Sequence, residues 1–354
     1  MKKKLLLFGI LVCGLVSFRC EKDPISGDME AKVKLNGVFI INEGGFGHNN
    51  GSLSFYSADD RSIQNNIFEQ VNGRDLGDVV QSITIIDTLG FIVVNNSNTI
   101  EVISIKSWKS LKTIHMAAGS SPRYLADGEN GKAYVTNLYA NNVSVISLSN
   151  YQIETSVKVG ANPEQIEIWD DKAFVANSGL GTGNTVSVID LSSNAVAATI
   201  TVGDNPVSVK KDQNNVIHVL CTGSWGDYTN PDDPGTNGGV FAINPVSLQV
   251  VDSLILEGHP SKLCIDNHNT GYFIDGSNII SFSTETYEVI NDTLIAGFYY
   301  GLALDPVSEK LFAMDARDYA QNGSVSVFDL EGNLLAAFDV GIIPGSAAFV
   351  YEKN

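Results

Sequence analysis

The sequence predicts an all-β protein that folds as a seven-bladed β-propeller with four antiparallel strands in each blade. Three observations lead to this prediction: a unit of short strands, its repetition along the chain, and one unpaired strand at the C-terminus. The unit is clearest in residues 163–206, where EQIEIW, KAFVAN, NTVSVIDL and VAATITVG follow one another with turn residues between them. Runs rich in Val, Ile, Thr, Phe and Ala that are bounded by Asp, Asn, Ser, Gly or Pro are typical of short antiparallel strands.

The unit recurs with a period of about 40 to 50 residues, which is typical of propeller blades. The second strands of the units are predicted at 37–42, 90–95, 132–137, 172–177, 216–221, 271–275 and 310–315. A third strand follows each of them, beginning near Gly51, Asn98, Asn142, Asn184, Gly239, Asn278 and Gly323. Links that end in proline lead from most units into the next, at Pro122, Pro163, Pro206, Pro260 and Pro344. The repeat therefore gives seven units without any predicted helix.

The count of first strands predicts how the ring closes. Six first strands begin near Val80, Arg123, Glu164, Val207, Lys262 and Tyr300. The seventh, GSAAFVY at 345–351, is left over at the C-terminus, whereas the N-terminal unit begins directly at its second strand with Gly37. We therefore expect the C-terminal strand to complete the N-terminal blade, which protects strand edges that an open row of sheets would expose. Residues 37–354 form a single domain in this interpretation.

The N-terminus has the pattern of an export signal. Lysines at positions 2–4 precede an apolar run at 5–16 that is too short to span a membrane, so residues 1–19 are predicted to be a signal peptide. The stretch SFRC resembles a bacterial lipobox, although Arg19 replaces the usual small residue, and CEKDP resembles the surface-export tag of Bacteroidota lipoproteins. We expect lipidation of Cys20 and a flexible tether over residues 20–36. An ordinary secreted protein is the alternative.

The net charge argues against one class of partner, and the cysteine content bears on disulfide formation. The chain carries 22 Lys and Arg against 40 Asp and Glu, a net charge of −18, and loss of residues 1–19 makes it −22. An acidic chain without Lys and Arg clusters argues against a nucleic-acid partner. Cys221 and Cys264 lie inside apolar runs, so they are expected to be small buried side chains, and a disulfide between them is possible but not indicated.

The site is expected on the face formed by the links from second to third strands and the links into the next blade, because loops carry function on a rigid scaffold. Two of these links are long: residues 43–50 contain Phe46 and His48, and residues 222–239 contain Trp225 and Tyr228. The other candidate ligand-binding residues in these links are Arg74, Arg123, Tyr139, Asn141, Phe298, Tyr299, Arg317 and Tyr319. Aromatic side chains with a few polar partners are typical of recognition surfaces. The alternative for each tyrosine is packing at a blade junction.

No catalytic or metal-binding pattern is visible, so neither an enzyme nor a cofactor is predicted. His115 and His218 fall inside strands and His268 lies on the opposite face, and no HExxH or GxSxG motif occurs. The glycine-rich GLGTG at 179–183 does not precede a helix, which makes phosphate binding there a weak hypothesis. Residues 230–238 contain enough oxygen ligands for Ca²⁺, but a solvated turn is the favoured interpretation.

The blade sequences GANPEQIEI, KAFVANSG, NTVSVIDL and TITVGDNP resemble the YncE-type (surface-layer-like) propeller family over residues 37–351. The stretch VFIINEGGFGHNNGSLSFYS resembles the opening blade of a Bacteroidota lipoprotein branch of that family. The resemblance implies a lipid-anchored protein on the surface of the outer membrane that binds a corrinoid, cobalamin (vitamin B12), and passes it to a TonB-dependent transporter. A propeller hydrolase of the lactonase kind and a glycan- or protein-binding adhesin are the alternatives.

Overall fold

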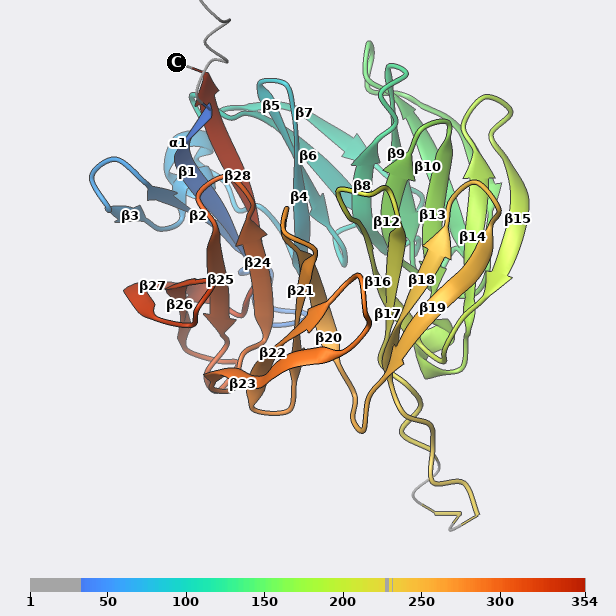
Figure 1. Ribbon diagram of the computed structural model, residues 1–354. Coiled ribbons are helices and arrows are strands. Elements are labelled where there is room, and N and C mark those ends of the chain that lie inside the picture. Colours follow the sequence, from blue (N-terminus) through green and yellow to red (C-terminus); the bar gives the residue numbers. More distant parts are fainter. Residues whose placement is uncertain (1–32, 227–228, 231, 354) are drawn as a thin grey trace, which may run out of the picture.

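The computed structural model describes residues 33–226, 229–230 and 232–353, and it shows a seven-bladed β-propeller (Figure 1). Each blade is an antiparallel sheet of four strands, which confirms the predicted fold class. The predicted signal peptide (1–19), the lipidated Cys20, most of the tether and Tyr228 lie outside the described residues. Within the described part of the chain, no helix has the length and apolar character needed to cross a membrane.

In every blade the four strands succeed one another from the axis of the ring outward. Blade 1 contains β28 (Pro344–Lys353), β1 (Val33–Asn42), β2 (Ser52–Ser57) and β3 (Ile63–Gln64), and blade 2 contains β4 (Val80–Ile86), β5 (Leu89–Val94), β6 (Thr99–Ser104) and β7 (Ser110–His115). Blade 3 contains β8 (Pro122–Asp127), β9 (Lys132–Asn137), β10 (Asn142–Ser147) and β11 (Ile153–Lys158), and blade 4 contains β12 (Pro163–Trp169), β13 (Lys172–Asn177), β14 (Thr185–Asp190) and β15 (Ala195–Thr201).

The remaining blades follow the same plan. Blade 5 contains β16 (Pro206–Lys211), β17 (Ile217–Cys221), β18 (Gly239–Asn244) and β19 (Gln249–Ile255). Blade 6 contains β20 (Ser261–Ile265), β21 (Thr270–Asp275), β22 (Asn278–Ser283) and β23 (Val289–Ala296). Blade 7 contains β24 (Gly301–Asp305), β25 (Lys310–Asp315), β26 (Asn322–Asp329) and β27 (Leu334–Ile342).

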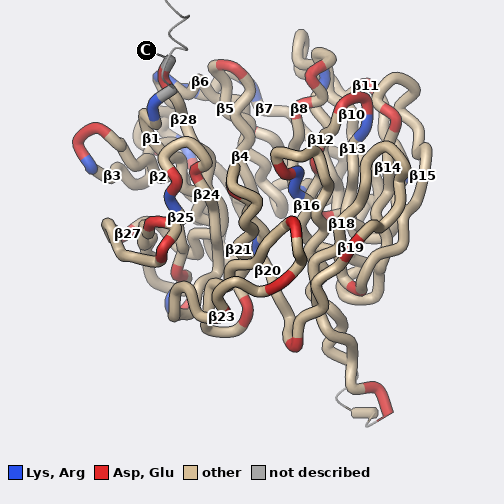
Figure 2. The backbone as a smooth tube through the Cα atoms, in the orientation of Figure 1, with Lys and Arg blue, Asp and Glu red and all other residues tan. Residues whose placement is uncertain are grey.

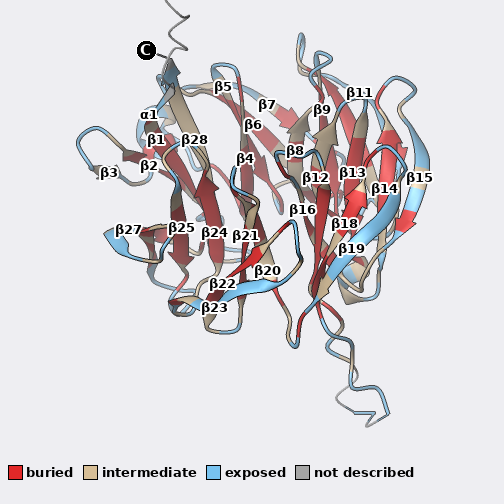
Figure 3. Ribbon diagram, viewed as in Figure 1, coloured by how far each residue is buried: buried red, intermediate tan, exposed pale blue. Residues whose placement is uncertain are grey.

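The core lies between neighbouring blades. Between blades 4 and 5, for example, Phe174 and Val186 pack in one cluster with Val209 and Val219, and all four side chains are buried. The second and third strands are buried on both sides, whereas the outer strands β15, β19 and β23 are mostly exposed (Figure 3). Strands packed between two sheets read as apolar runs because both of their faces leave water.

The ring closes as the sequence predicts. β28 pairs with β1 in antiparallel register, with Val38 opposite Phe349 and Ile40 opposite Ala347. The inner strands contact one another in the order β4, β8, β12, β16, β20, β24, β28 and back to β4. The domain begins earlier than the predicted Gly37, because β1 starts at Val33 and its first residues pair with the end of β28. Residues 33–36 therefore belong to the propeller and not to the tether.

Two helical turns depart from the expectation of no helix. α1 (Ile67–Asn72) lies in the link between blades 1 and 2, where it buries Ile67 and Phe68 and ends at Gly73 with φ 67°. The outer strand β3 has only two residues, so α1 occupies part of the position of a longer outer strand and contacts β2. A short 3-10 helix, η1 (Gly179–Gly181), lies in the link of blade 4.

The inner strands are joined by side chains rather than by a β-ladder. Ser82 donates a hydrogen bond to the carbonyl of Arg123 at 2.8 Å, and Thr84 donates to the carbonyl of Leu125 at 2.6 Å. The backbone N–H of Val209 donates to the side-chain oxygen of Gln165 at 3.2 Å. These bonds fix the inner strands around a central axis. Cys221 and Cys264 are both buried free thiols, as expected.

Candidate functional site

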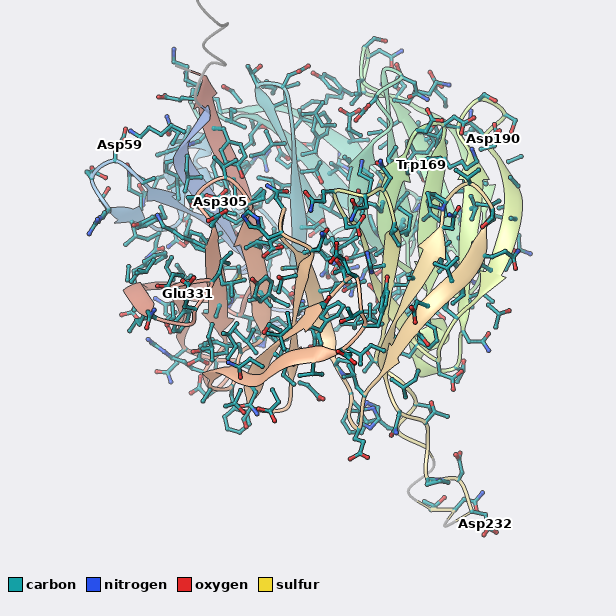
Figure 4. The ribbon with its side chains drawn as sticks, in the orientation of Figure 1. Asp59, Trp169, Asp190, Asp232, Asp305 and Glu331 are labelled. Carbon is teal, nitrogen blue, oxygen red and sulfur yellow. The ribbon has the colours of Figure 1, made fainter. Side chains whose placement is uncertain are left out.

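The two ends of the propeller differ in what they carry. The second-to-third-strand links and the links into inner strands share one end, which we call the loop face. Its longest parts are residues 222–238 and residues 65–79, which contain α1, and the other predicted long link, residues 43–51, is the next longest. β1 runs from Val33 toward this face, so the described chain begins and ends at the opposite end (Figure 1). Asp232, in the link 222–238, lies far from the body of the propeller, and Asp190 lies at the other end of the molecule (Figure 4).

Exposed aromatic side chains are concentrated on the loop face. Among the described residues, Phe46, Tyr139, Trp225, Phe298 and Tyr319 are the exposed aromatics, with exposed fractions of 56–78%. All five lie in links of the loop face, and the sequence analysis placed each of them there. An exposed aromatic ring leaves a large apolar area in contact with water, which is unfavourable unless a binding partner covers it. Five such rings on one face are therefore typical of a surface that contacts a ligand or partner.

The link that carries Phe46 is held at both ends. The Asp78 carboxylate accepts hydrogen bonds from the Gly47 N–H at 2.9 Å and from the Asn96 side chain at 2.6 Å. The Gly44 N–H donates to the carbonyl of Ile342 at 3.1 Å, which ties the link to blade 7. The link is therefore fixed against two other blades, while Phe46 remains exposed.

Trp225 rests on a polar support. Its ring lies over the imidazole of His259 with 3.5 Å between the ring centroids and an angle of 27° between the planes. His259 is fixed in turn by contacts to the carbonyl of Thr222 at 3.0 Å through Nδ1 and to Asp275 at 3.2 Å through its backbone N–H. One face of the indole is thus supported and the side chain is still 58% exposed, which leaves area for a ligand to stack on.

A ring of polar side chains surrounds the axis just inside the loop face. It is formed by the second residues of five inner strands, namely Gln81, Arg123, Glu164, Lys262 and Gly345. Gly345 contributes no side chain, and the carboxylate of Glu43, the first residue after β1, fills its place. A Cβ atom at position 345 would lie 2.4 Å from Oε1 of Glu43. Glycine is therefore required at this position so that Glu43 can reach the axis.

The ring is connected by charge-assisted hydrogen bonds. Arg123 forms a two-point ion pair with Glu164, with Nε–Oε2 at 2.8 Å and Nη2–Oε1 at 3.2 Å, and it also donates to the Gln81 side chain. Burial opposes ionisation of the guanidinium, but Glu164 raises the pKa of Arg123 above its usual range. This geometry is the strong bidentate form of the interaction.

Glu43 has a different environment within the same ring. Burial raises the pKa of Glu43, and the opposing effects of Lys262 and Tyr300 are smaller. Tyr300 donates a hydrogen bond to Oε2 of Glu43 at 2.9 Å, and Lys262 lies over the Tyr300 ring with its Nζ 5.2 Å from the centroid. Tyr300 also meets the exposed Tyr319 edge to face at 5.7 Å. The polar ring and the aromatic surface are therefore continuous at Tyr300.

Several residues predicted as ligand contacts form bonds or pack within the protein, and their role in binding stays a prediction. Arg74 pairs with the buried Glu101 at 2.8 Å, and Asn141 accepts the backbone N–H of Asn162 at 2.8 Å between blades 3 and 4. Tyr299 is half-buried and packs against Phe328 with 6.4 Å between centroids, and Arg317 bonds Asn322 and Asp339 within blade 7. Each of these side chains is occupied by a neighbouring link or strand. His48 is exposed beside Gly45 in the link 43–51.

The polar ring was missed by the sequence analysis apart from Arg123. A usable signal was present, because Arg123, Glu164 and Gly345 each follow the proline that ends a link. The first residues of the inner strand after that proline turn toward the axis, so charged side chains there predict an axial cluster. The described residues contain no group of three or more His, Cys, Asp or Glu side chains arranged to hold a metal ion. The arrangement can stack a flat apolar ligand and hydrogen-bond its polar groups.

Comparisons with known proteins agree on the fold. A search of proteins with curated functions finds no match. Solved structures of similar fold include a quinonprotein alcohol dehydrogenase-like protein from Bacteroides thetaiotaomicron (TM-score 0.68, 13% identity, 89% of this chain and 78% of that one). A functionally unknown protein from Desulfotomaculum acetoxidans gives a TM-score of 0.66 at 15% identity, over 89% of this chain and 98% of that one. AztD from Citrobacter koseri gives 0.57 at 10% identity, over 89% of this chain and 98% of that one.

At such low identities these structures establish the fold alone. The sequence comparison is more specific, because a family model described as "Domain of unknown function (DUF5074)" matches residues 36–341. This match covers nearly the entire propeller, from the second strand of blade 1 to the outer strand of blade 7. The chain therefore belongs to the DUF5074 family of β-propeller proteins.

Proposed function

We propose that the loop face binds a corrinoid, and that this protein captures the ligand at the cell surface and passes it to a TonB-dependent transporter. The observation that carries the proposal is the group of five exposed aromatic side chains confined to the loop face. A corrinoid is a large ligand with apolar edges and amide side chains. Rigid aromatic groups contribute apolar contact area at low entropic cost, and the nearby polar ring offers groups that pair with amides.

The resemblance of the blade sequences to a corrinoid-binding lipoprotein branch supports the same ligand. The proposal includes a lipid anchor at Cys20. β1 begins at the end of the propeller opposite the loop face, so an anchor attached through the N-terminus leaves the loop face accessible to a ligand. Replacing the acceptor thiol in Cys20→Ser should release the protein from the membrane fraction of its host, as measured by fractionation and immunoblotting. Unchanged membrane retention would contradict the anchor while leaving ligand binding open.

Trp225→Ala should weaken cyanocobalamin binding on the order of tenfold or more, because buried aromatic anchors dominate binding energies at contact surfaces. Isothermal titration of the domain that begins at residue 33 measures the effect. The matched control is Leu111→Ala, which removes a side chain of similar exposure (55%, against 58% for Trp225) from the outer strand β7. Absence of cyanocobalamin binding by the unmodified protein would refute the corrinoid. Equal affinities of the two variants would place the ligand elsewhere.

A further inference from the structure

A cavity of about 190 Å³ lies on the axis of the propeller, below the polar ring. All seven inner strands contribute to its wall, and its polar side chains include Ser82, Thr84, Gln165, Lys210, Lys262 and Ser346. A water molecule needs roughly 10–15 Å³ in such a measure, so the cavity has room for a small organic or inorganic molecule. None of the aromatic residues proposed above to contact a corrinoid lines it.

The charged side chains of the wall all have the same sign. Lys210 and Lys262 line the cavity, and no Asp or Glu is part of the wall. This is unexpected in a chain of net charge −18, in which acidic residues outnumber basic ones over much of the molecule (Figure 2). Lysine ammonium groups that are withdrawn from bulk water are stabilised by a counter-charge or a hydrogen-bond acceptor.

Neither lysine has such a partner among the described residues. Nζ of Lys262 contacts the face of Tyr300, and no ion pair or hydrogen bond connects either ammonium to another described side chain. Other lysines of the chain do form pairs, such as Lys132 with Glu154 at 2.9 Å and Lys172 with Asp171. The two half-buried lysines of the cavity therefore have no counter-charge in contact, and outside the cavity the half-buried Lys310 likewise forms no ion pair.

Among the neutral polar groups of the wall, one donor is left for a ligand. The hydroxyls of Ser82, Thr84 and Ser346 already donate to backbone carbonyls of neighbouring inner strands. Gln165 accepts the Val209 N–H with its side-chain oxygen, so its amide nitrogen is left as a donor. The groups that remain for a ligand are thus two ammonium groups and one amide N–H₂, which is the chemistry of an oxyanion site.

The nearest carboxylates do not form ion pairs with Lys210 or Lys262. Glu167 and Glu43 lie close enough to Lys210 and Lys262, respectively, to interact with them electrostatically, but not within ion-pair distance. Burial raises the pKa of both carboxyl groups, and the lysines oppose this effect only in part. Glu164 is already paired with Arg123.

We propose that the axial cavity binds a small oxyanion, of the size of phosphate or a short dicarboxylate, through Lys210, Lys262 and the amide of Gln165. The site is separate from the aromatic surface of the loop face and does not depend on the identity of the ligand bound there. Phosphate and carboxylate share the recognition chemistry, because both present negatively charged oxygens to ammonium and amide donors.

Isothermal titration of the propeller with inorganic phosphate and, separately, with succinate tests the proposal at constant ionic strength. We expect at least one probe to bind with one-to-one stoichiometry, and the responding probe identifies the kind of oxyanion. Lys210→Gln and Lys262→Gln should each weaken binding on the order of tenfold, because each removes a charge-assisted hydrogen bond. The matched control is Lys211→Gln, the exposed neighbour in β16, which should bind as the unmodified protein does.

Absence of binding of both probes at millimolar concentrations would overturn the proposal. Equal weakening by Lys211→Gln would also overturn it, since it would indicate attraction by general surface charge. Should the lysine variants fail to fold, Gln165→Glu keeps both lysines and introduces a carboxylate into the cavity. It should abolish binding of the probe while far-UV circular dichroism stays unchanged, and retained binding would refute the site. Cyanocobalamin titrations of Lys210→Gln and Gln165→Glu, which lie outside the polar ring, are expected to be unaffected, so failure of one proposal can be told from failure of the other.

Discussion

A chain that ends at Ile343 should lose its cooperative unfolding transition, because β28 closes the ring. This truncation removes the inner strand of blade 1 and leaves one edge of β1 without its hydrogen-bonded partner. It also removes Ala347, Phe349 and Tyr351, which pack against the core between blades 1 and 7. Each large apolar side chain contributes about 1.5–3 kcal/mol by burial, and the ladder adds further stability. The expected loss of unfolding free energy is therefore comparable to the total stability of a domain, about 5–15 kcal/mol.

Chemical denaturation followed by tryptophan fluorescence and circular dichroism measures this effect. A chain that ends at Lys353, which lacks only Asn354, serves as the control and should unfold as the full domain does. Addition of a peptide covering residues 344–354 should restore a cooperative transition to the truncated chain, because its register with β1 is fixed by the apolar pattern of both strands. A sigmoidal transition of unchanged midpoint in the truncated chain alone would show that closure by β28 is dispensable.

Arg123→Met should reduce the free energy of unfolding by about 3 kcal/mol, because removal of one partner from a largely buried ion pair leaves the other charge uncompensated. The side chains of Arg123 and Glu164 are 21% and 12% exposed, and the guanidinium also holds Gln81. Methionine retains much of the apolar volume of the arginine stem, so the measured difference reports mainly the lost charge and hydrogen bonds. Urea denaturation at neutral pH gives the value.

Two further variants identify the cause of that effect. Lys132→Met breaks the more exposed pair with Glu154, and its expected effect stays within about 1 kcal/mol. Combining Arg123→Met with Glu164→Gln should recover part of the lost stability, since the second change removes the uncompensated carboxylate. Equal losses in Arg123→Met and Lys132→Met would argue against a special role of the axial pair.

The sequence contains enough information for the architecture and for the surface on which to look for a ligand. Strand patterns are local, so the repeat and the unpaired strand at 345–351 predict both the blade number and the closure with Gly37–Asn42 of β1. Link lengths are also local, so residues 43–50 and 222–239 mark the loop face correctly. Phe46, Trp225 and the other exposed aromatics could be assigned to that face because the two strands that a link joins determine the end of the propeller at which it lies. Their role in binding stays a prediction.

The direction in which each side chain points within those links could not be read from the sequence. Arg123 turns toward the axis and Arg74 toward blade 2, although both lie near links into inner strands. Tyr299 is packed against Phe328 whereas its neighbour Phe298 is exposed. The polar ring and the axial cavity depend on residues from all seven inner strands, which are separated by about 40 residues each and meet only when the ring closes. Burial, ion pairing and cavity shape at the axis are long-range properties of the packed ring, and so they follow from the tertiary structure rather than from any one blade.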